Sequence, residues 1–272
     1  MQRSEELLAL ARGLKIGYLR DNLGPFVLEA ASEGWSLEDA LCELFSREAE
    51  SRRLSTLRRH VKDAGFPYRM TLGEFRTQHL SAEVRRDVRV LSTLQFVDEG
   101  RNAVLVGNPG VGKTALAVAL GMECCQGGGT VRFVSVPNLV VQVKEAMSLN
   151  EITRFRKSFD KPDLVVLDDL GYCSFDKECG EVLFNLLSNR NGNGSMVVTT
   201  NLRFERWNEV FNDEVLTGAI VDRLAHKAHV VDMTGESFRV IETGEWMRKV
   251  AQATEEAWLT FQLRCGSFFN FA

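Results

Sequence analysis

One stretch of the sequence has the residue types and the spacing of a phosphate-binding loop. It reads Gly107-Asn108-Pro109-Gly110-Val111-Gly112-Lys113-Thr114. This run matches the pattern G-x-x-x-x-G-K-[ST] at every position, and in such a loop the glycines let successive backbone N–H groups face a phosphate. We expect Lys113 to reach the β- and γ-phosphates and Thr114 to bind Mg²⁺. The loop predicts a nucleoside triphosphate site, and a glycine-rich turn without nucleotide is the alternative.

Two acidic residues further along the chain could act on the same nucleotide. Asp168 and Asp169 follow an apolar run, Leu164-Val165-Val166-Leu167, that is typical of a buried strand. A parallel strand would carry both carboxylates to the edge of the sheet at which the loop lies. We expect Asp168 to hold Mg²⁺ through water and Asp169 to polarise the attacking water, which predicts hydrolysis. A pair of acids at an exposed strand end is the alternative.

Alternating strands and helices are expected to position these residues. The apolar run Ala103-Val104-Leu105-Val106 leads into the loop as a strand, and a helix follows from about Lys113. Further strands and helices are predicted at 130–136, 177–190, 196–200, 213–225 and 228–233. The pattern predicts an α/β fold in which helices cover both faces of a parallel sheet. Asn201 ends the 196–200 strand, where it either orients the attacking water or caps a turn.

The first 68 residues are predicted to form a separate helical domain. Ser36, with Asp39 three residues later, resembles a capping box and is expected to begin a long helix that ends near Gly65. The apolar side of this helix is expected to carry Leu37, Leu41, Leu44, Phe45, Leu54, Leu57 and Val61. Its second half carries a basic stripe, which is either a solvated face or a contact for DNA phosphates. The candidate DNA-binding residues are Arg52, Arg53, Arg58 and Arg59.

A linker is predicted between this domain, at 1–68, and the nucleotide-binding domain. Phe66-Pro67-Tyr68 interrupts the helical pattern, and residues 69–80 have the character of a connecting segment. The second domain is expected to span 81–244 and to begin with a single helix over 81–99. No function is assigned to the segment 245–272.

The net charge, the cysteines and the apolar runs limit the partners and the cellular compartment that we expect for this protein. A net charge of −4 in 272 residues creates no global basic field, so any contact with DNA must come from a local patch. The six cysteines contain no C-x-x-C pair, which predicts reduced, buried thiols rather than disulfides or a zinc site. No apolar run approaches the roughly 18 residues that span a bilayer, and no apolar leader is present. We therefore expect a cytoplasmic protein without a membrane partner.

Several segments, some of them outside the nucleotide motifs, resemble one known family. They are Leu10-Ala11-Arg12-Gly13-Leu14-Lys15, Phe66-Pro67-Tyr68, Asp169-Leu170-Gly171-Tyr172, Thr200-Asn201, Asp222-Arg223-Leu224 and Gly235-Glu236-Ser237-Phe238-Arg239. In these segments the chain is similar to the IstB-like ATPases, which assist transposition of insertion sequences. That family is related to the DnaC-type helicase loaders of the AAA+ class. Two positions depart from its pattern, because Asp169 stands where glutamate is usual and Arg76 stands where aspartate is expected.

The resemblance implies a AAA+ core with a small all-helical N-terminal domain, and ATP and Mg²⁺ as cofactors. It implies that Asn201 is a sensor, that Arg223 is a finger acting on a neighbouring subunit's nucleotide, and that Arg239 is a second sensor. A surface ion pair with Asp222 is the alternative for Arg223. The implied partners are double-stranded DNA, a transposase encoded in the same element and further copies of the chain. A replicative helicase loader and a DNA scaffold that binds ATP without hydrolysing it are the alternative functions.

Overall fold

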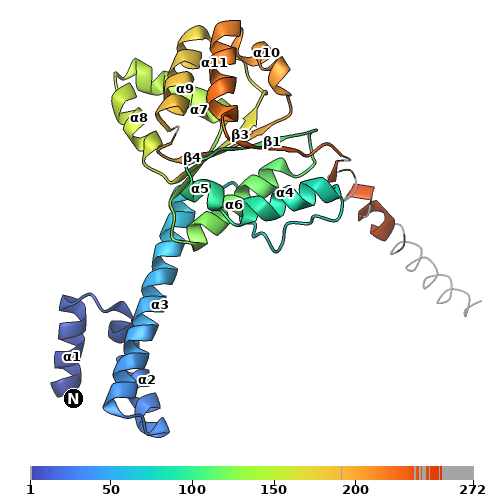
Figure 1. Ribbon diagram of the computed structural model, residues 1–272. Coiled ribbons are helices and arrows are strands. Elements are labelled where there is room, and N and C mark those ends of the chain that lie inside the picture. Colours follow the sequence, from blue (N-terminus) through green and yellow to red (C-terminus); the bar gives the residue numbers. More distant parts are fainter. Residues whose placement is uncertain are drawn as a thin grey trace, which may run out of the picture.

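Five parallel strands form one sheet in the order β2-β3-β4-β1-β5 within the part of the chain that the structure describes (Figure 1). The computed structural model describes residues 2–190, 192–235, 237–238, 240, 243–244, 246–250 and 252. The strands are β1 (Ala103–Val106), β2 (Val131–Ser135), β3 (Leu164–Leu170), β4 (Ser195–Thr200) and β5 (His229–Asp232). Each lies at a predicted position, so the carboxyl ends of β1, β3 and β4 meet at one edge of the sheet.

Helices cover both faces of this sheet (Figure 1). The helices of one face are α4 (Ala82–Ser92), α5 (Gln95–Asp98) and α6 (Lys113–Gln126). Those of the other face are α7 (Val136–Ser148), α8 (Ile152–Asp160), α9 (Lys177–Arg190), α10 (Asn208–Phe211) and α11 (Glu214–Ala225), with a short 3₁₀ turn, η1 (Phe204–Arg206), before α10. The arrangement confirms the predicted α/β fold with a covered parallel sheet.

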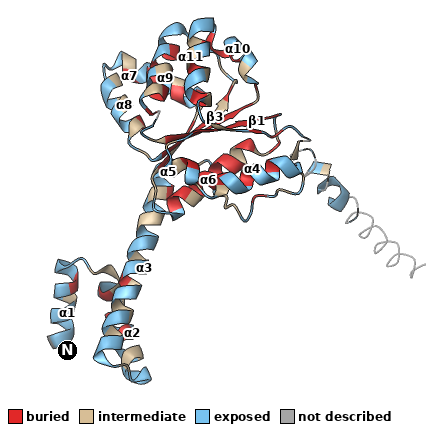
Figure 2. Cartoon of the chain, viewed as in Figure 1, coloured by how far each residue is buried: buried red, intermediate tan, exposed pale blue. Residues whose placement is uncertain are grey.

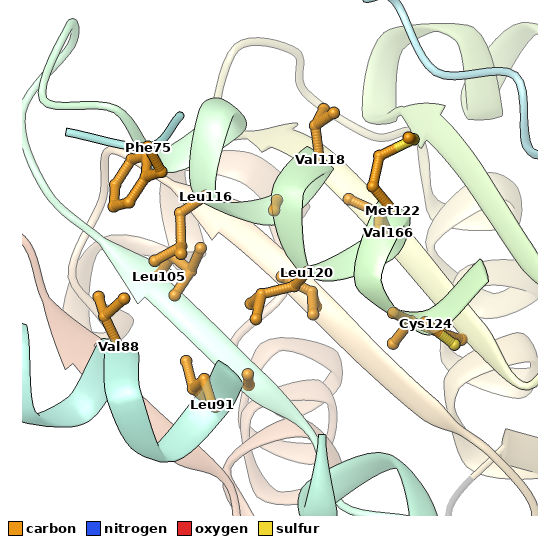
Figure 3. Close-up of a cluster of buried hydrophobic side chains, with 14 of the residues drawn as sticks. Phe75, Val88, Leu91, Leu105, Leu116, Val118, Leu120, Met122, Cys124 and Val166 are labelled. Carbon is orange, nitrogen blue, oxygen red and sulfur yellow. The ribbon is translucent and has the colours of Figure 1, made fainter. Parts of the chain in front are cut away.

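The side chains of β3 alternate between two apolar clusters, one on each face of the sheet. Leu164 and Val166 pack in the cluster that contains α6, whereas Val165 and Leu167 pack in the cluster that contains α7 and α9. Figure 3 shows part of the first cluster, between α6 and the strands. Because burial of one large aliphatic side chain contributes about 1.5–3 kcal/mol, the two clusters hold the strand ends rigidly in place.

Three helices precede the sheet domain and form an arm that extends away from it (Figure 1). They are α1 (Gln2–Gly13), α2 (Gly17–Glu33) and α3 (Leu37–Ala64). The Ser36 side chain accepts a hydrogen bond from the backbone N–H of Asp39, and Gly65 ends α3 in the left-handed region with a φ of 73°. Both ends of α3 are therefore as predicted.

The last turns of α3 belong to the core of the sheet domain. Val61 and Ala64 are buried in the cluster that contains α6, and Leu57 packs against it. The expected apolar side of α3 is covered only in part, because Leu37 and Phe45 are 77% and 60% exposed. The reason is that α1 and α2 bury only a small cluster of their own, Ala11, Leu19 and Leu23. Figure 2 shows the resulting predominance of exposed residues in the arm.

Two further expectations need correction. The predicted helix over 81–99 is broken into α4 and α5, because Leu94 adopts a left-handed φ of 56° between them. The thiols of Cys124, Cys125 and Cys179 are buried as predicted, but Cys42 is exposed on α3. Burial raises the pKa of the Cys124 thiol to about 12, which keeps it protonated and unreactive at neutral pH.

Among the residues that the structure describes, none of the helices has both the length and the apolar character needed to cross a membrane.

Candidate nucleotide site

The phosphate loop connects β1 to α6 and depends on its glycines. Gly110 and Gly112 have φ values of 85° and 98°, in the left-handed region that a residue with a Cβ atom adopts only with strain. At Gly107 a Cβ atom would lie 2.6 Å from the carbonyl oxygen of Met233, which follows β5. The first glycine is therefore required for close backbone packing and the other two for the turn itself.

The side chain of Lys113, the first residue of α6, is folded back onto this loop. Its ammonium donates hydrogen bonds to the carbonyl oxygens of Gly107 and Asn108, at 2.7 and 2.8 Å, and the residue is 8% exposed. Gly112 provides no side-chain cap for the N-terminus of α6. The ammonium and the positive end of the helix dipole thus raise the electrostatic potential at the same loop, which favours an anion there.

The two sequence motifs meet at a hydrogen bond between Thr114 and Asp168. The hydroxyl of Thr114 lies 2.9 Å from Oδ1 of Asp168, across a separation of 54 residues in the sequence. Asp168 is 5% exposed. A hydroxyl and a carboxylate oxygen are the hard ligands that Mg²⁺ prefers, so the donor set fits the expected ion.

Asp169 and Asn201 lie at the same edge of the sheet. Asp169 has a φ of 63°, and its backbone N–H donates to the hydroxyl of Thr199 at 2.9 Å. Asn201 follows β4, which lies between β1 and β3, as expected for a sensor position. Its Oδ1 is buried and makes no hydrogen bond to another described residue. A Cβ atom at position 171 would lie 2.5 Å from this oxygen, so Gly171 is what leaves room for the amide.

Sequence reasoning missed Thr199. Its side chain is fully buried, and its hydroxyl donates to Oδ1 of Asp168 at 2.6 Å while also accepting from Asp169. A threonine in an apolar strand resembles an ordinary core residue, and no local pattern distinguishes it. Only the position of the neighbouring strand reveals the contact.

A cavity of about 270 Å³ lies beside the loop, between the linker and the segment after β5. Phe75, His79, Ala115 and Phe238 are among its lining residues. The backbone N–H of Phe238 donates to the carbonyl of Gly110 at 2.9 Å, which attaches this segment to the loop. The rings of His79 and Phe238 lie 5.1 Å apart. An apolar cavity with aromatic walls next to a phosphate loop is suited to a planar base.

The arginine expected to act as a finger, Arg223, is carried by a helix that does not pack on the phosphate-loop helix α6. Arg223 lies in the last turn of α11, is exposed, and forms no ion pair with Asp222 or another described acid. The helix that carries it packs on α9 and α10 rather than on α6. Arg239 lies outside the described residues.

The candidate DNA-binding arginines of α3 fall into two pairs. Arg52 is bound to Glu48 with a distance of 2.5 Å between Nε and Oε1, and Arg53 is bound to Glu50 at 2.8 Å. Arg58 and Arg59 are exposed, and neither forms an ion pair with any described residue. The two pairs therefore differ in how readily they could accept a phosphate.

Comparison with known proteins identifies the family of this chain. The family described as IstB-like ATP binding protein matches residues 9–245. The insertion sequence IS21 putative ATP-binding protein of Pseudomonas aeruginosa is 32% identical over 237 residues, which cover 87% of this chain and 89% of that protein. The insertion sequence IS5376 putative ATP-binding protein of Geobacillus stearothermophilus is 31% identical over 78% of this chain and 85% of that protein.

A solved structure supports the assignment at the level of fold. The crystal structure of DnaI aligns with a TM-score of 0.52 and 24% identity, and the match covers 62% of this chain and 90% of that one. This likeness shows that the two chains share a fold over the aligned part. The match over residues 9–245 and the two insertion-sequence relatives establish that the chain belongs to the family of IstB-like ATP binding proteins.

Proposed function

We propose that the chain binds and hydrolyses ATP at the edge of the sheet where β1, β3 and β4 end. The observation that carries this proposal is the 2.9 Å contact between Thr114 and Asp168, because it joins the phosphate loop to the acidic strand. The Lys113 ammonium neutralises charge on the terminal phosphates. Asp169 accepts a hydrogen bond from the attacking water, and Asn201 orients that water with the buried oxygen of its amide.

Magnesium fits this scheme as the expected cofactor. Thr114 and Asp168 would hold the ion, directly or through water, and Mg²⁺ would supply positive charge that shields the phosphates. The cavity lined by Phe75, His79 and Phe238 would receive the adenine ring.

We propose transposition of an insertion sequence as the process that this ATPase serves. The support is the family membership over residues 9–245 and the printed names of the relatives, which are ATP-binding proteins of insertion sequences. In this proposal the chain engages double-stranded DNA and recruits or stimulates a transposase of the same element. The likeness to DnaI supports a shared fold alone, so a helicase-loading function is the weaker candidate.

We also propose that the active form is an oligomer in which Arg223 acts on a neighbouring subunit's nucleotide. Its support is that Arg223 is exposed, forms no ion pair with a described residue and lies on a helix that packs away from α6. An arginine delivered by a neighbour would neutralise charge that develops on the γ-phosphoryl group.

Phosphate release from ATP, measured with and without duplex DNA, tests the enzymatic proposal. We expect Asp169→Asn to bind a fluorescent ATP analogue normally while phosphate release falls by about 10²-fold or more, since the water loses its acceptor. Lys113→Ala should lose both binding and release. Asp87→Asn, which changes a half-exposed acid of α4, is the matched control and should behave as wild type.

Two outcomes would contradict this proposal. If the wild-type chain bound ATP but released no phosphate under any of these conditions, the chain would be a nucleotide-dependent scaffold. If Asp169→Asn lost nucleotide affinity together with turnover, Asp169 would be a metal ligand instead of the acceptor for water.

A further inference from the structure

The pairing of β3 with β4 changes register at the two acidic residues. The strands pair regularly from Leu164 opposite Ser195 to Leu167 opposite Val198, and pairing resumes at Leu170 opposite Thr200. Two residues of β3, Asp168 and Asp169, thus lie opposite one residue of β4, Thr199. This count is the defining feature of a β-bulge.

The packing of β3 confirms that one extra residue is accommodated here. Along a regular strand, residues separated by an odd number of positions point to opposite faces of the sheet. Leu167 and Leu170 are three positions apart, yet both pack in the cluster that contains α7 and α9. The alternation is therefore shifted by one residue within the acidic pair.

The shift matters because two consecutive acids must act at one site. In a regular strand their carboxylates would point to opposite faces, and only one of them could face the phosphate loop. Instead, Asp169 adopts a left-handed φ of 63°, which is unfavourable for a residue with a Cβ atom and persists only where neighbours hold it.

Thr199 makes the contacts that hold this arrangement. Its hydroxyl donates to Oδ1 of Asp168 at 2.6 Å and accepts from the backbone N–H of Asp169 at 2.9 Å. The Thr114 hydroxyl of the phosphate loop lies 2.9 Å from the same Oδ1 of Asp168. One buried hydroxyl therefore connects the extra residue of the bulge to the carboxylate that faces the loop.

The other buried hydroxyls of β4 have different partners. The Ser195 hydroxyl donates to the carbonyl of Phe96 at 3.0 Å, and the hydroxyl of Thr200 bonds to the backbone of Leu202. These contacts fasten α5 and the segment after β4 to the sheet and touch neither acid. Thr199 thus differs from its neighbours in what it contacts, although all three residues are fully buried.

We propose that Thr199 is a positioning residue, which keeps both acids of the bulge directed at the nucleotide through its single hydroxyl. The proposal rests on the proposed function, in which Asp168 holds Mg²⁺ and Asp169 acts on water. Loss of the hydroxyl would remove one of the two hydroxyl contacts of Asp168 Oδ1, leaving the one from Thr114, and would remove the side-chain acceptor of the Asp169 N–H. Both the response to Mg²⁺ and the rate of turnover would then suffer.

Substitution of Thr199 by valine and by serine tests this proposal, because valine keeps the shape and serine keeps the hydroxyl. For the full-length Thr199→Val chain we expect the Mg²⁺ concentration that half-saturates binding of a fluorescent ATP analogue to rise by about 10-fold or more. Phosphate release at saturating ATP should fall by about 10- to 100-fold, which is typical when a supporting contact of a metal ligand is removed. Thr199→Ser should restore both quantities.

Ser195→Ala is the matched control, since it removes a buried hydroxyl from the same strand without touching an acid. It should lower thermal stability while leaving the Mg²⁺ response unchanged. If Thr199→Val does not fold, as judged by circular dichroism, Thr199→Ala replaces it in the same comparison.

A wild-type response to Mg²⁺ and wild-type turnover in Thr199→Val would overturn the proposal. It would equally be overturned if Thr199→Ser failed to rescue, or if Ser195→Ala showed the same defects. Failure of the proposed hydrolysis gives a different result, namely a wild-type chain that releases no phosphate. Nucleotide binding by that chain would still respond to Mg²⁺, and the Thr199 variants can be compared on that response.

Discussion

The nucleotide edge of the sheet and the N-terminal arm, residues 2–64, differ in how far their side chains are buried and hydrogen-bonded. At the edge, Lys113, Asp168 and Thr199 are each less than a tenth exposed, and each forms short hydrogen bonds. In the arm, large apolar side chains are at least 60% exposed, namely Leu10, Leu14, Leu28, Leu37 and Phe45. The edge is a network of buried, hydrogen-bonded groups, whereas the arm leaves much of its apolar surface in contact with solvent.

A few polar contacts hold the arm together in place of a large core. Glu48 is buried and accepts hydrogen bonds from the backbone N–H groups of Gly17 and Tyr18, at the start of α2, and from Arg52. Arg47 connects α3 to α2 through a bidentate contact with Glu29. The same type of mutation should therefore affect chemistry in one region and local stability in the other.

The largest effect is expected from Arg223→Ala, which asks whether the nucleotide edge is complete within one chain. If a neighbour supplies this arginine, turnover should fall by roughly 10³- to 10⁵-fold while ATP binding remains. Mixed with Lys113→Ala subunits, the variant should recover some phosphate release, because those subunits lend an intact Arg223 to sites whose loop is whole. Absence of recovery in mixtures that demonstrably assemble together would place any action of Arg223 within its own subunit.

A smaller effect is expected from Glu48→Ala, which tests whether the arm is stabilised independently of the edge. The change leaves two N–H groups of α2 and the Nε–H of Arg52 without their partner, at a cost of about 1–3 kcal/mol in local stability. Hydrogen exchange of the α2 amides should accelerate, while phosphate release without DNA stays at the wild-type rate. An equal loss of turnover would show that the two regions are coupled. Glu43→Ala, which removes a partly exposed acid from the same helix, is the control.

Lowering the pH should destabilise the arm selectively, through the carboxylate of Glu48. Burial opposes ionisation of Glu48, but hydrogen bonds from Arg52, Tyr18 and Gly17 outweigh it, so its pKa lies below the ordinary value of 4.5. A lowered pKa in the folded arm means that this contribution to stability is present above pH 4.5 and is lost as the pH falls through the folded value. As the pH falls through that range, hydrogen exchange of the α2 amides, corrected for its intrinsic dependence on pH, should accelerate in the wild-type protein. Glu48→Gln should remove this pH dependence, and its persistence in that variant would assign the effect to another group.

The smallest effect is expected within the basic stripe of the arm. Arg58 and Arg59 form no ion pair with a described residue, whereas Arg52 and Arg53 are bound to acids. Replacing Arg58 and Arg59 with alanine should flatten the salt dependence of DNA binding by up to about 0.9 in logarithmic slope for each lost phosphate contact. Replacing Arg52 and Arg53 with alanine should change the slope less. Fluorescence anisotropy of labelled DNA at several salt concentrations measures both slopes. Equal slopes in the wild type and in both double variants would show that the stripe is a solvated face that does not contact DNA phosphates.

Much of the nucleotide edge could be predicted because its signals are local. The loop needs glycine at Gly110 and Gly112 for their positive φ angles, and the apolar runs before Gly107 and Asp168 are long enough to mark buried strands. Such requirements act within a few neighbouring residues, so they are visible in the sequence. Apart from the helix expected over 81–99, the predicted strands and helices of the sheet domain accordingly lie within one or two residues of those observed.

Other features depend on how distant segments meet. Leu94 breaks a helical pattern that has no glycine or proline at that point, because the chain turns there to bury Phe96. The apolar side of α3 has the period of a buried helix, but burial requires a partner, and α1 and α2 cover only part of it. Helical periodicity therefore predicts the element without deciding what covers it.

The sequence by itself determined that this protein has a phosphate loop, an acidic strand and alternating strands and helices, because backbone conformation and strand burial follow from short runs of residues. The tertiary structure alone decided that Asp168 and Asp169 lie opposite Thr199, because register is a relation between two strands that are distant in the chain. It likewise decided that Phe238 bonds to the loop and that the helix carrying Arg223 packs on α9 and α10. Contacts of this kind arise from packing, which no single segment encodes.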